Sequence, residues 1–255
     1  TRPKDMDFYN VYLGRRVRHD ASRRFDPVPT LPPHEVLAME LAESPSASEE
    51  LRRAKEAREL PRVYTSHPAV TGAPPGVDVH PIALYMDGVQ YHRTDSVLGV
   101  WVHFLLTGRR HLVAVLRQSE MCSCGCRGWC SLFPIMSMLA WSLAAMRNGL
   151  HPTRRHDGRG WLDSDGARAS FAGLALAFRA VCVFVKGDWA EHVHTLGFPT
   201  WHDALASCIF CFASPAQLFD THGVSLLGMP HGKKQLEHYE EACNACEKHV
   251  VVDRG

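Results

Sequence analysis

The sequence predicts a mixed α/β fold, in which one sheet carries helices on its faces. Two apolar runs, Ile82–Met86 and Ala180–Val185, have the composition of strands covered on both faces. A third segment, Leu132–Leu150, is apolar all round and long enough for a core helix. The chain has 255 residues, 45% of them hydrophobic and 22% charged, which is ordinary for a globular protein. One large domain with an insertion fits these totals.

Residues 1–77 predict a helical and basic segment with proline-rich linkers. After the spacer at 27–33, Pro33–Ala42 has helical periodicity with proline in its first turn. Ser46 or Ser48 can cap a second helix, whose side chains are nearly all polar, so we expect a solvated surface helix. For residues 1–24 we predict no particular helix or strand. Because the chain starts with Thr rather than Met, we expect a fragment or a processed product.

The predicted main domain covers residues 78–206, after a loop of turn residues. Short turns between successive apolar runs predict an antiparallel meander, followed by the helix and a last strand. The expected strands are 82–86, 96–106, 110–116 and 180–185. The helix is expected to begin after Pro134 and to end at Asn148-Gly149. Residues 207–255 are expected to form a cysteine-containing insertion.

The charge pattern restricts where an anionic partner can bind. The formal net charge is only +1, so the whole molecule has no field that would attract nucleic acid. The attraction must come from local clusters of arginine. These candidates for phosphate contacts are Arg15, Arg16, Arg18, Arg23, Arg24, Arg154 and Arg155.

Targeting signals and cysteine usage predict the compartment. We find no run of roughly 18 apolar residues without charges and no basic leader before an apolar core. The sequence therefore predicts no membrane partner and no secretion. The nine cysteines are an odd number, and their grouping suits metal better than a disulfide framework. We expect an intracellular, reducing compartment.

Two aspartates follow the ends of predicted strands. Asp87 precedes Gly88, and Asp188 follows Lys186-Gly187. Brought together at neighbouring strand ends, two carboxylates can hold Mg²⁺ or Mn²⁺ while substrate phosphates complete the coordination shell. Such sites catalyse phosphoryl transfer with two metal ions. The structural alternatives are a turn aspartate for Asp87 and a helix N-cap for Asp188.

The cysteines form three groups with metal-ligand spacing. Two CxxC pairs predict a shared Zn²⁺ site, with two unrelated buried thiol pairs as the alternative; the residues are Cys208, Cys211, Cys243 and Cys246. His222, His231, His238 or His249 could replace one ligand. Four closely spaced thiols predict either a second Zn²⁺ site or redox-prone thiols; these are Cys122, Cys124, Cys126 and Cys130. Their spacing does not match the ferredoxin runs of iron–sulfur proteins.

A competing metal centre involves the histidine-rich stretch after Asp188. Two imidazoles from a His-x-His pair, with nearby carboxylates, could build a hydrolytic zinc site. Its candidate residues are Glu191, His192, His194, His202 and Asp203. A third ligand at a recognised spacing is missing, and structural or exposed histidines are the commoner case.

From about His80 to Phe212, the order of elements resembles the catalytic core of plant-type CACTA (En/Spm-like) transposases, which belong to the RNase H-like DDE class. The resemblance rests on Asp87-Gly88, on the strand Val97-Leu-Gly-Val-Trp-Val102, on Leu139-Ala-Trp141, and on Asp188 followed by Cys208-x2-Cys211. The segment 121–130, MCSCGCRGWC, lies outside the pattern of that family.

This resemblance implies an RNase H-like mixed sheet flanked by helices, with a cysteine-rich zinc-binding insertion. It implies a transposase-like polynucleotidyl transferase fragment in which Asp87 and Asp188 bind Mg²⁺ or Mn²⁺ for DNA strand cleavage and joining. The implied partner is DNA at transposon ends, the implied location is the nucleus, and a homo-oligomer is compatible with it. A third acid is also implied, but none of Glu237, Glu240, Glu241 and Glu247 follows a convincing helix start. The alternative function is a non-catalytic, zinc-stabilised DNA-binding or interaction module derived from a transposon.

Overall fold

The computed structural model describes residues 7–17, 20–122, 124, 126, 128–200, 202–203, 207–217, 231–242 and 244. Cys243 and Cys246, two of the predicted zinc ligands, lie outside these residues. The chain forms two compact units, residues 1–191 and residues 192–255. The first unit contains both sheets and helices α1–α6.

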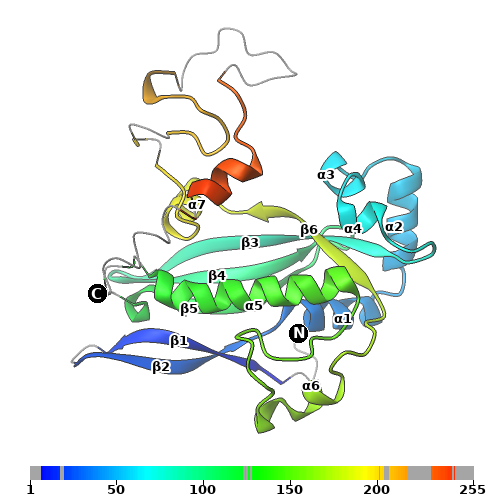
Figure 1. Ribbon diagram of the computed structural model, residues 1–255, viewed down its shortest axis with the longest axis horizontal. Helices are drawn as coiled ribbons and strands as arrows, with labels where there is room; N and C mark the ends of the chain where they lie inside the picture. The colour runs from blue at the N-terminus through cyan, green and yellow to red at the C-terminus, as the bar shows by residue number, and fades with distance from the viewer. Residues whose placement is uncertain are drawn as a thin grey trace. The chain divides into compact units, whose positions relative to one another are not determined.

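The first unit is built on a mixed four-stranded sheet with the order β5-β4-β3-β6 (Figure 1). Its strands are β3 (Val79–His92), β4 (Asp95–Phe104), β5 (Arg110–Arg117) and β6 (Arg179–Lys186). Strands β3, β4 and β5 pair antiparallel, and β6 pairs parallel with β3. A parallel neighbour requires a long crossover, which here includes α5. The mixed α/β fold and the antiparallel meander are therefore confirmed.

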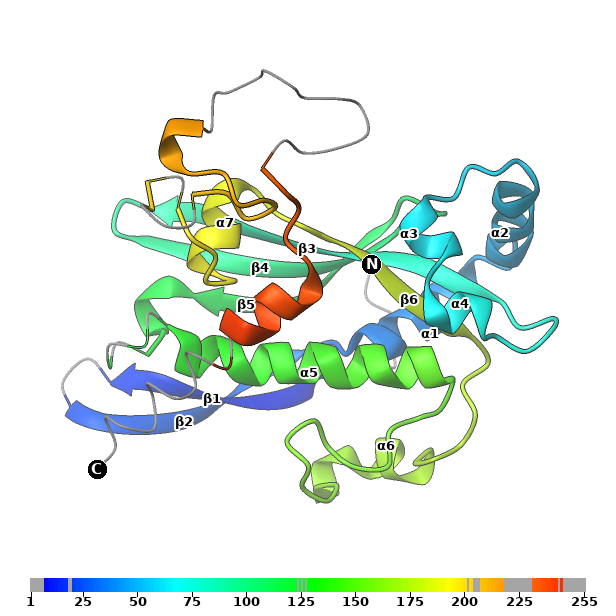
Figure 2. The ribbon, with the colours of Figure 1, turned by 45° about the horizontal axis from the view of Figure 1, so that its top comes forward.

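Helix α5 (Trp129–Asn148) lies alongside this sheet and contacts β6, β1 and α1 (Figures 1 and 2). The prediction placed its start after Pro134, which was wrong. Gly128, in the left-handed conformation with φ 85°, lets the chain turn directly into the helix. Pro134 then lies inside the helix, where it removes one backbone N–H donor. Gly149, with φ 70°, ends the helix at the predicted position.

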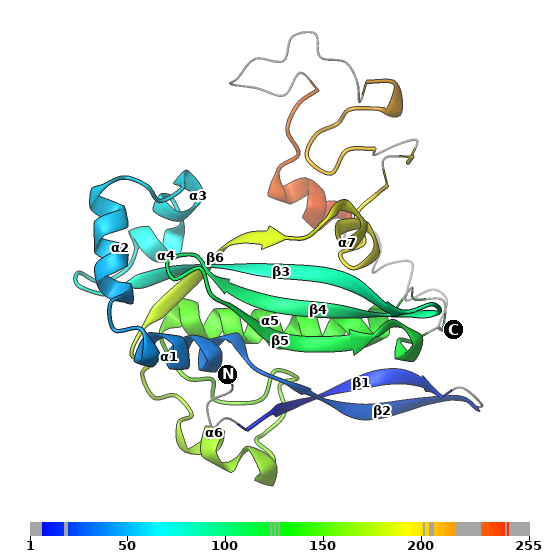
Figure 3. The ribbon, with the colours of Figure 1, turned by 180° about the vertical axis from the view of Figure 1, so that it is seen from behind.

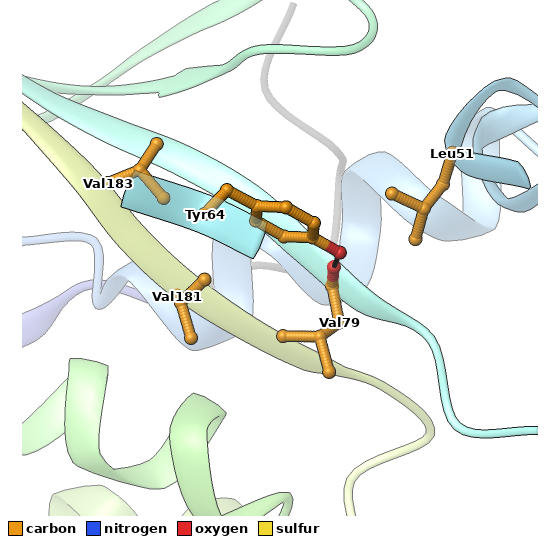
Figure 4. Close-up of a cluster of buried hydrophobic side chains, with 5 residues drawn as sticks. All are labelled: Leu51, Tyr64, Val79, Val181 and Val183. Atoms are coloured by element: carbon orange, nitrogen blue, oxygen red, sulfur yellow. Dashed lines mark hydrogen bonds between the residues drawn. The ribbon is translucent and has the colours of Figure 1, made fainter. Parts of the chain in front are cut away.

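Four helices precede the sheet: α1 (Pro33–Glu43), α2 (Ala47–Glu56), α3 (Arg62–Thr65) and α4 (Pro68–Thr71). The predicted α1 and α2 are confirmed. Helices α2 to α4 gather at the end of the sheet where β3 begins (Figure 3). Their contact with the sheet is a buried cluster of Leu51, Tyr64, Val79, Val181 and Val183 (Figure 4). Leu51 is fully buried, so α2 is amphipathic rather than solvated on all sides.

The N-terminal stretch forms an antiparallel hairpin that the sequence analysis missed. Its strands are β1 (Tyr9–Val17) and β2 (Asp20–Thr30). β1 alternates buried and exposed residues, with Tyr9, Val11 and Leu13 in the core. β1 contacts α5, and β2 contacts β5. The hairpin is thus packed into the first unit.

A buried polar network connects the start of β1 to the loop before α6 (Gly166–Ser170). Arg155 pairs with Asp165, and both side chains are almost completely buried. The Arg155 guanidinium also lies 4.6 Å from the ring centroid of Tyr9 and donates a 2.6 Å hydrogen bond to the carbonyl of Asn10. The prediction that Arg155 contacts phosphates was wrong, because a buried and paired guanidinium is not accessible to a nucleic-acid backbone. Arg154 is exposed.

Helix α5 is long and apolar enough to span a membrane by length and composition alone. The sequence was expected to contain no apolar run long enough for a membrane span, and that expectation was wrong for α5. The buried residues of α5 include Leu132, Ile135, Met138, Leu139 and Met146. A core helix of a globular unit has the same properties.

Candidate metal sites: an acidic sheet edge and a four-cysteine cluster

Asp87 and Asp188 belong to neighbouring parallel segments, Asp87 inside β3 and Asp188 just past the end of β6. The parallel register of β3 and β6 pairs Tyr85 with Lys186. Asp87 lies two residues beyond Tyr85, and Asp188 lies two residues beyond Lys186. The predicted end of β6 is confirmed, but the prediction that the first strand ends before Asp87 was wrong, because β3 stays paired with β4 through Asp87 and continues to His92. The register puts the two aspartates at equivalent positions. β6 leads directly from this end into α7 (Trp189–His194) (Figure 2).

Asp87 is half-buried and accepts a 2.8 Å hydrogen bond from the hydroxyl of Tyr85. Tyr85 and Asp87 are two residues apart on a strand, so they lie on one face of the sheet. The hydrogen bond to Asp87 is the largest of the effects that raise the pKa of Tyr85, and burial and the charges of Asp87 and Asp188 add to it. Both carboxylates therefore act electrostatically on the same phenol.

Gly99 occupies the position directly opposite Asp87 on β4. A Cβ atom at Gly99 would overlap the indole ring of Trp101. The Trp101 ring in turn packs against Tyr85, with the ring centroids 5.4 Å apart. The absence of a side chain at Gly99 therefore lets the indole lie back over the strand, next to the tyrosine that binds Asp87.

Basic groups lie on the face that carries Tyr85 and Asp87. The ammonium of Lys186 is 3.4 Å from Nδ1 of His103, and the guanidinium of Arg110 is 5.6 Å from the ring centroid of Tyr85. Burial lowers the pKa of His103, and the charges of Lys186 and Arg110 lower it further. A neutral His103 can then accept a hydrogen bond from Lys186. Sequence analysis missed these three residues, because only strand pairing brings them together.

Asp188 also caps the N-terminus of α7, which was the structural alternative predicted for it. Its Oδ1 atom accepts a 2.7 Å hydrogen bond from the backbone N–H of Glu191, three residues later. This is the bond made by an N-cap residue. The Glu191 side chain lies beside Gly88, since a Cβ atom added there would be 2.5 Å from its Oε1. Successive residues of a strand face opposite sides, so Glu191 lies on the face of the sheet away from the Asp87 side chain.

The four cysteines between β5 and α5 form the second candidate site. Their sulfur atoms all lie within 4.8 Å of one another, close enough to share one metal ion; they belong to Cys122, Cys124, Cys126 and Cys130. None of the four forms a disulfide. Burial is the largest cause of the raised pKa of Cys122 and of Cys130, which reaches about 12. Without a metal these two thiols are therefore protonated at neutral pH.

The predicted CxxC of the second unit is only partly described. The N–H of Phe210 donates to the sulfur of Cys208 at 3.4 Å, and Cys211 pairs with Lys233 in an antiparallel bridge. Burial acts to raise the pKa of Cys208, but hydrogen bonds from Phe210 and Cys211 outweigh it, and the pKa is lowered. His231 has a buried Nε2 atom without a hydrogen-bond partner. The shared zinc site stays a prediction, since its other two cysteines are outside the described residues.

The competing histidine centre lies around the start of the second unit. The ring of His192 stacks on Phe198 with 6.3 Å between centroids. In the part of the chain that the structure describes, the only group of three or more ligand residues close enough for one ion is the four-cysteine cluster. His192, His202 and Asp203 do not belong to such a group. The side chain of His194, another predicted ligand, lies outside what the structure describes, and the described side chains give no support to a hydrolytic zinc centre there.

Comparison with protein-family models, with curated proteins and with solved structures returns no match for this chain. The two candidate sites are therefore the features of the chain that point to a function.

Proposed function

We propose that this chain is a transposase-like polynucleotidyl transferase fragment with an RNase H-like core, which cleaves and joins DNA strands with Mg²⁺ or Mn²⁺ bound by Asp87 and Asp188. The observation that carries the proposal is the parallel pairing of β3 with β6, whose register, continued by two residues, puts Asp87 inside β3 level with Asp188 just past the end of β6. The mixed sheet with its helices is compatible with that core.

The chemistry requires carboxylates at the point where the phosphate reacts. Divalent ions held there activate the attacking oxygen and stabilise the leaving one. Asp87 and Asp188 are the primary ligands in this proposal. Tyr85 holds the Asp87 carboxylate in one orientation through its hydrogen bond.

Substrate phosphates need cationic partners near the ions. Lys186 and Arg110 lie on the face that carries Tyr85 and Asp87, and they replace Arg155 as the candidates for this role. Arg110 is exposed, and Lys186 is half-buried. Contacts to phosphates from Arg and Lys give affinity without sequence specificity and weaken with added salt.

The test is nicking of supercoiled DNA by the purified chain in Mg²⁺, in Mn²⁺ and in chelator. Asp87→Asn and Asp188→Asn should reduce nicking to the level measured in chelator. Asn is as good an N-cap as Asp, so the second variant removes the charge and keeps the helix start. Asp163→Asn, at an exposed residue of the short helix Asp163–Asp165, is the matched control and should leave nicking unchanged. Nicking that persists in both site variants would contradict the proposal.

The second candidate is a DNA-binding or interaction module without catalysis. The N-cap bond of Asp188 favours it, because this bond gives the aspartate a purely structural reason to be there. This candidate predicts salt-sensitive DNA binding that is the same with and without Mg²⁺. Measuring DNA affinity in Mg²⁺ and in chelator, alongside the nicking assay, separates the two functions.

A further inference from the structure

We propose that Cys122, Cys124, Cys126 and Cys130 bind one Zn²⁺ ion, and that this ion fixes the start of α5 against strand β1. The site does not depend on the proposed DNA chemistry, because it is formed by other residues, between β5 and α5.

The sulfur positions fit a tetrahedral ion. Zinc–sulfur bonds of about 2.3 Å in a tetrahedron put the sulfur atoms about 3.8 Å apart. The sulfur atoms of Cys124 and Cys130 are 3.8 Å apart, and all four lie within 4.8 Å of one another. A disulfide would require a separation of about 2.05 Å. The cluster thus has the dimensions of a metal site.

The ligand chemistry points to zinc in a structural role. Thiolates are soft ligands that select zinc, copper(I) or iron–sulfur clusters. Four protein thiolates fill a tetrahedral shell and leave no position for a substrate, which is the pattern of structural zinc sites. Cys130 is the second residue of α5, so its sulfur lies at the helix N-terminus, where the exposed N–H groups favour a negative charge.

The backbone around the cluster is shaped for several sulfurs to converge. The N–H of Cys130 donates to the sulfur of Cys126 at 3.4 Å. Gly128 reverses the chain between these two cysteines with φ 85°, a conformation that other residues rarely adopt. Hydrogen bonds from N–H groups to sulfur are a regular way to stabilise a metal-bound thiolate.

The cluster is bonded to the hairpin through one serine. The N–H of Cys122 donates to Oγ of Ser131 at 2.8 Å, and this hydroxyl donates to the carbonyl of Gly14 at 2.6 Å. Gly14 belongs to β1, and Ser131 to the first turn of α5. Holding Cys122 and Cys130 on one ion would therefore fix Ser131 at the distance that Gly14 requires. Loss of the ion should loosen β1 from α5.

The first experiment measures metal on the full chain, purified under reducing conditions, by elemental analysis and by the absorption of the Co²⁺-substituted protein. The wild-type chain should show sulfur-to-cobalt charge-transfer bands of a tetrahedral thiolate site. Cys124→Ser combined with Cys130→Ser should lose one equivalent of metal, while Cys208→Ser combined with Cys211→Ser should keep the metal of this cluster. An unchanged metal content in the first double variant would overturn the proposal.

A second experiment needs no variant and so does not depend on how well one folds. The wild-type chain is alkylated with iodoacetamide with bound Zn²⁺ and after chelation, and labelled cysteines are mapped by mass spectrometry. The four cluster cysteines should be protected only with Zn²⁺, whereas Cys182 on β6 should label equally in both samples. Equal labelling of the cluster in both samples would refute zinc binding.

The structural consequence has its own readout. Hydrogen exchange at Leu13 and Gly14 should become at least about tenfold faster after chelation, because local opening of β1 becomes easier. Exchange in the cluster of Figure 4, at Val79 and Val181, should be unaffected. If β1 exchanges at the same rate with and without Zn²⁺, the ion does not fix the hairpin.

Discussion

The hydroxyl of Tyr85 donates a 2.8 Å hydrogen bond to Oδ2 of Asp87, two residues along the same strand. Alternate residues of a strand lie on one face, but their side chains usually stand apart. Here the ring of Tyr85 leans along the strand, with Trp101 packed against it. The phenol thereby sets the orientation of a carboxylate that we propose as a metal ligand.

Tyr85→Phe should keep the fold and weaken the metal site. The loss of one half-buried hydrogen bond costs about 1 kcal/mol of the free energy of unfolding. A freely rotating Asp87 carboxylate should bind Mg²⁺ more weakly, so the Mg²⁺ concentration for half-maximal nicking should rise. Titration of nicking against Mg²⁺ measures this. Tyr91→Phe, on the exposed end of β3, is the control. An unchanged Mg²⁺ requirement in Tyr85→Phe would remove Tyr85 from the site.

Gly99→Ala should destabilise the protein because the new methyl group would overlap the Trp101 ring. Overpacking of this kind costs about 1–3 kcal/mol of the free energy of unfolding. Denaturant unfolding compares it with Gly160→Ala, where a Cβ atom would meet open space. A second substitution, Trp101→Leu, should recover part of the loss. Equal stability of the Gly99 and Gly160 variants would mean that the indole can move away without cost.

Asp165→Asn should be among the most destabilising single changes in the first unit. It leaves the Arg155 guanidinium buried and unpaired, and breaking such a pair costs about 3–5 kcal/mol. The matched surface change is Asp157→Asn, whose partner Arg159 is largely exposed and which should cost at most about 1 kcal/mol. Thermal unfolding of both variants measures the difference. Similar losses for the two would show that water reaches Arg155.

Stability should fall as the pH is lowered from about 7 to 5, partly because of His34. Burial lowers the pKa of His34 to about 3, and the nearby His151 and Arg168 act in the same direction. The unfolded chain takes up a proton near pH 6.5 and the folded chain does not, so stability is lost below that pH. The expected loss at pH 5 is about 2 kcal/mol from this residue.

His34→Gln should flatten this pH dependence, and denaturant unfolding at pH 7 and pH 5 measures it. Nδ1 of His34 is hydrogen-bonded to the hydroxyl of Ser142 at 2.8 Å. Glutamine keeps a polar group at this position. The carboxylate next to His34, Glu35, accepts hydrogen bonds of 2.6 and 2.8 Å from the guanidinium of Arg168. His92→Gln, on the exposed end of β3, is the control and should leave the slope unchanged. A slope that survives in His34→Gln must come from other buried histidines.

The strands of the main sheet and helix α5 were predictable because each is a long apolar segment bounded by turn residues. The hairpin was not, since β1 and β2 contain several arginines and two prolines among few apolar residues. Its few apolar side chains become buried only because α5 packs against β1. In the same way Arg155 looked like a surface arginine, because the sequence does not show that Asp165 and Tyr9 surround it.

The candidate sites show the same difference between features that are local in the sequence and features that depend on strand pairing. The four cysteines between β5 and α5 are close in sequence, so their convergence could be predicted from spacing. The strand end before Asp188 could be predicted too, and so could the N-cap bond of Asp188, whereas β3 continues past Asp87 to His92. Which strands are neighbours could not be predicted, because parallel pairing leaves no local signal. For this reason Lys186, His103 and Arg110 appeared only in the structure.

Strand β3 has two regions with different numbers of neighbours. From Val79 to Tyr85 it is paired with β6, but from Gly88 onward it has only β4 beside it and is exposed to solvent. The outer end of the β3–β4 hairpin can therefore fray without disturbing the buried region. Asp87 is the last half-buried residue before that change. It lies two residues beyond the last pair with β6, so its carboxylate stands at the boundary between the doubly paired region of β3 and the hairpin tip.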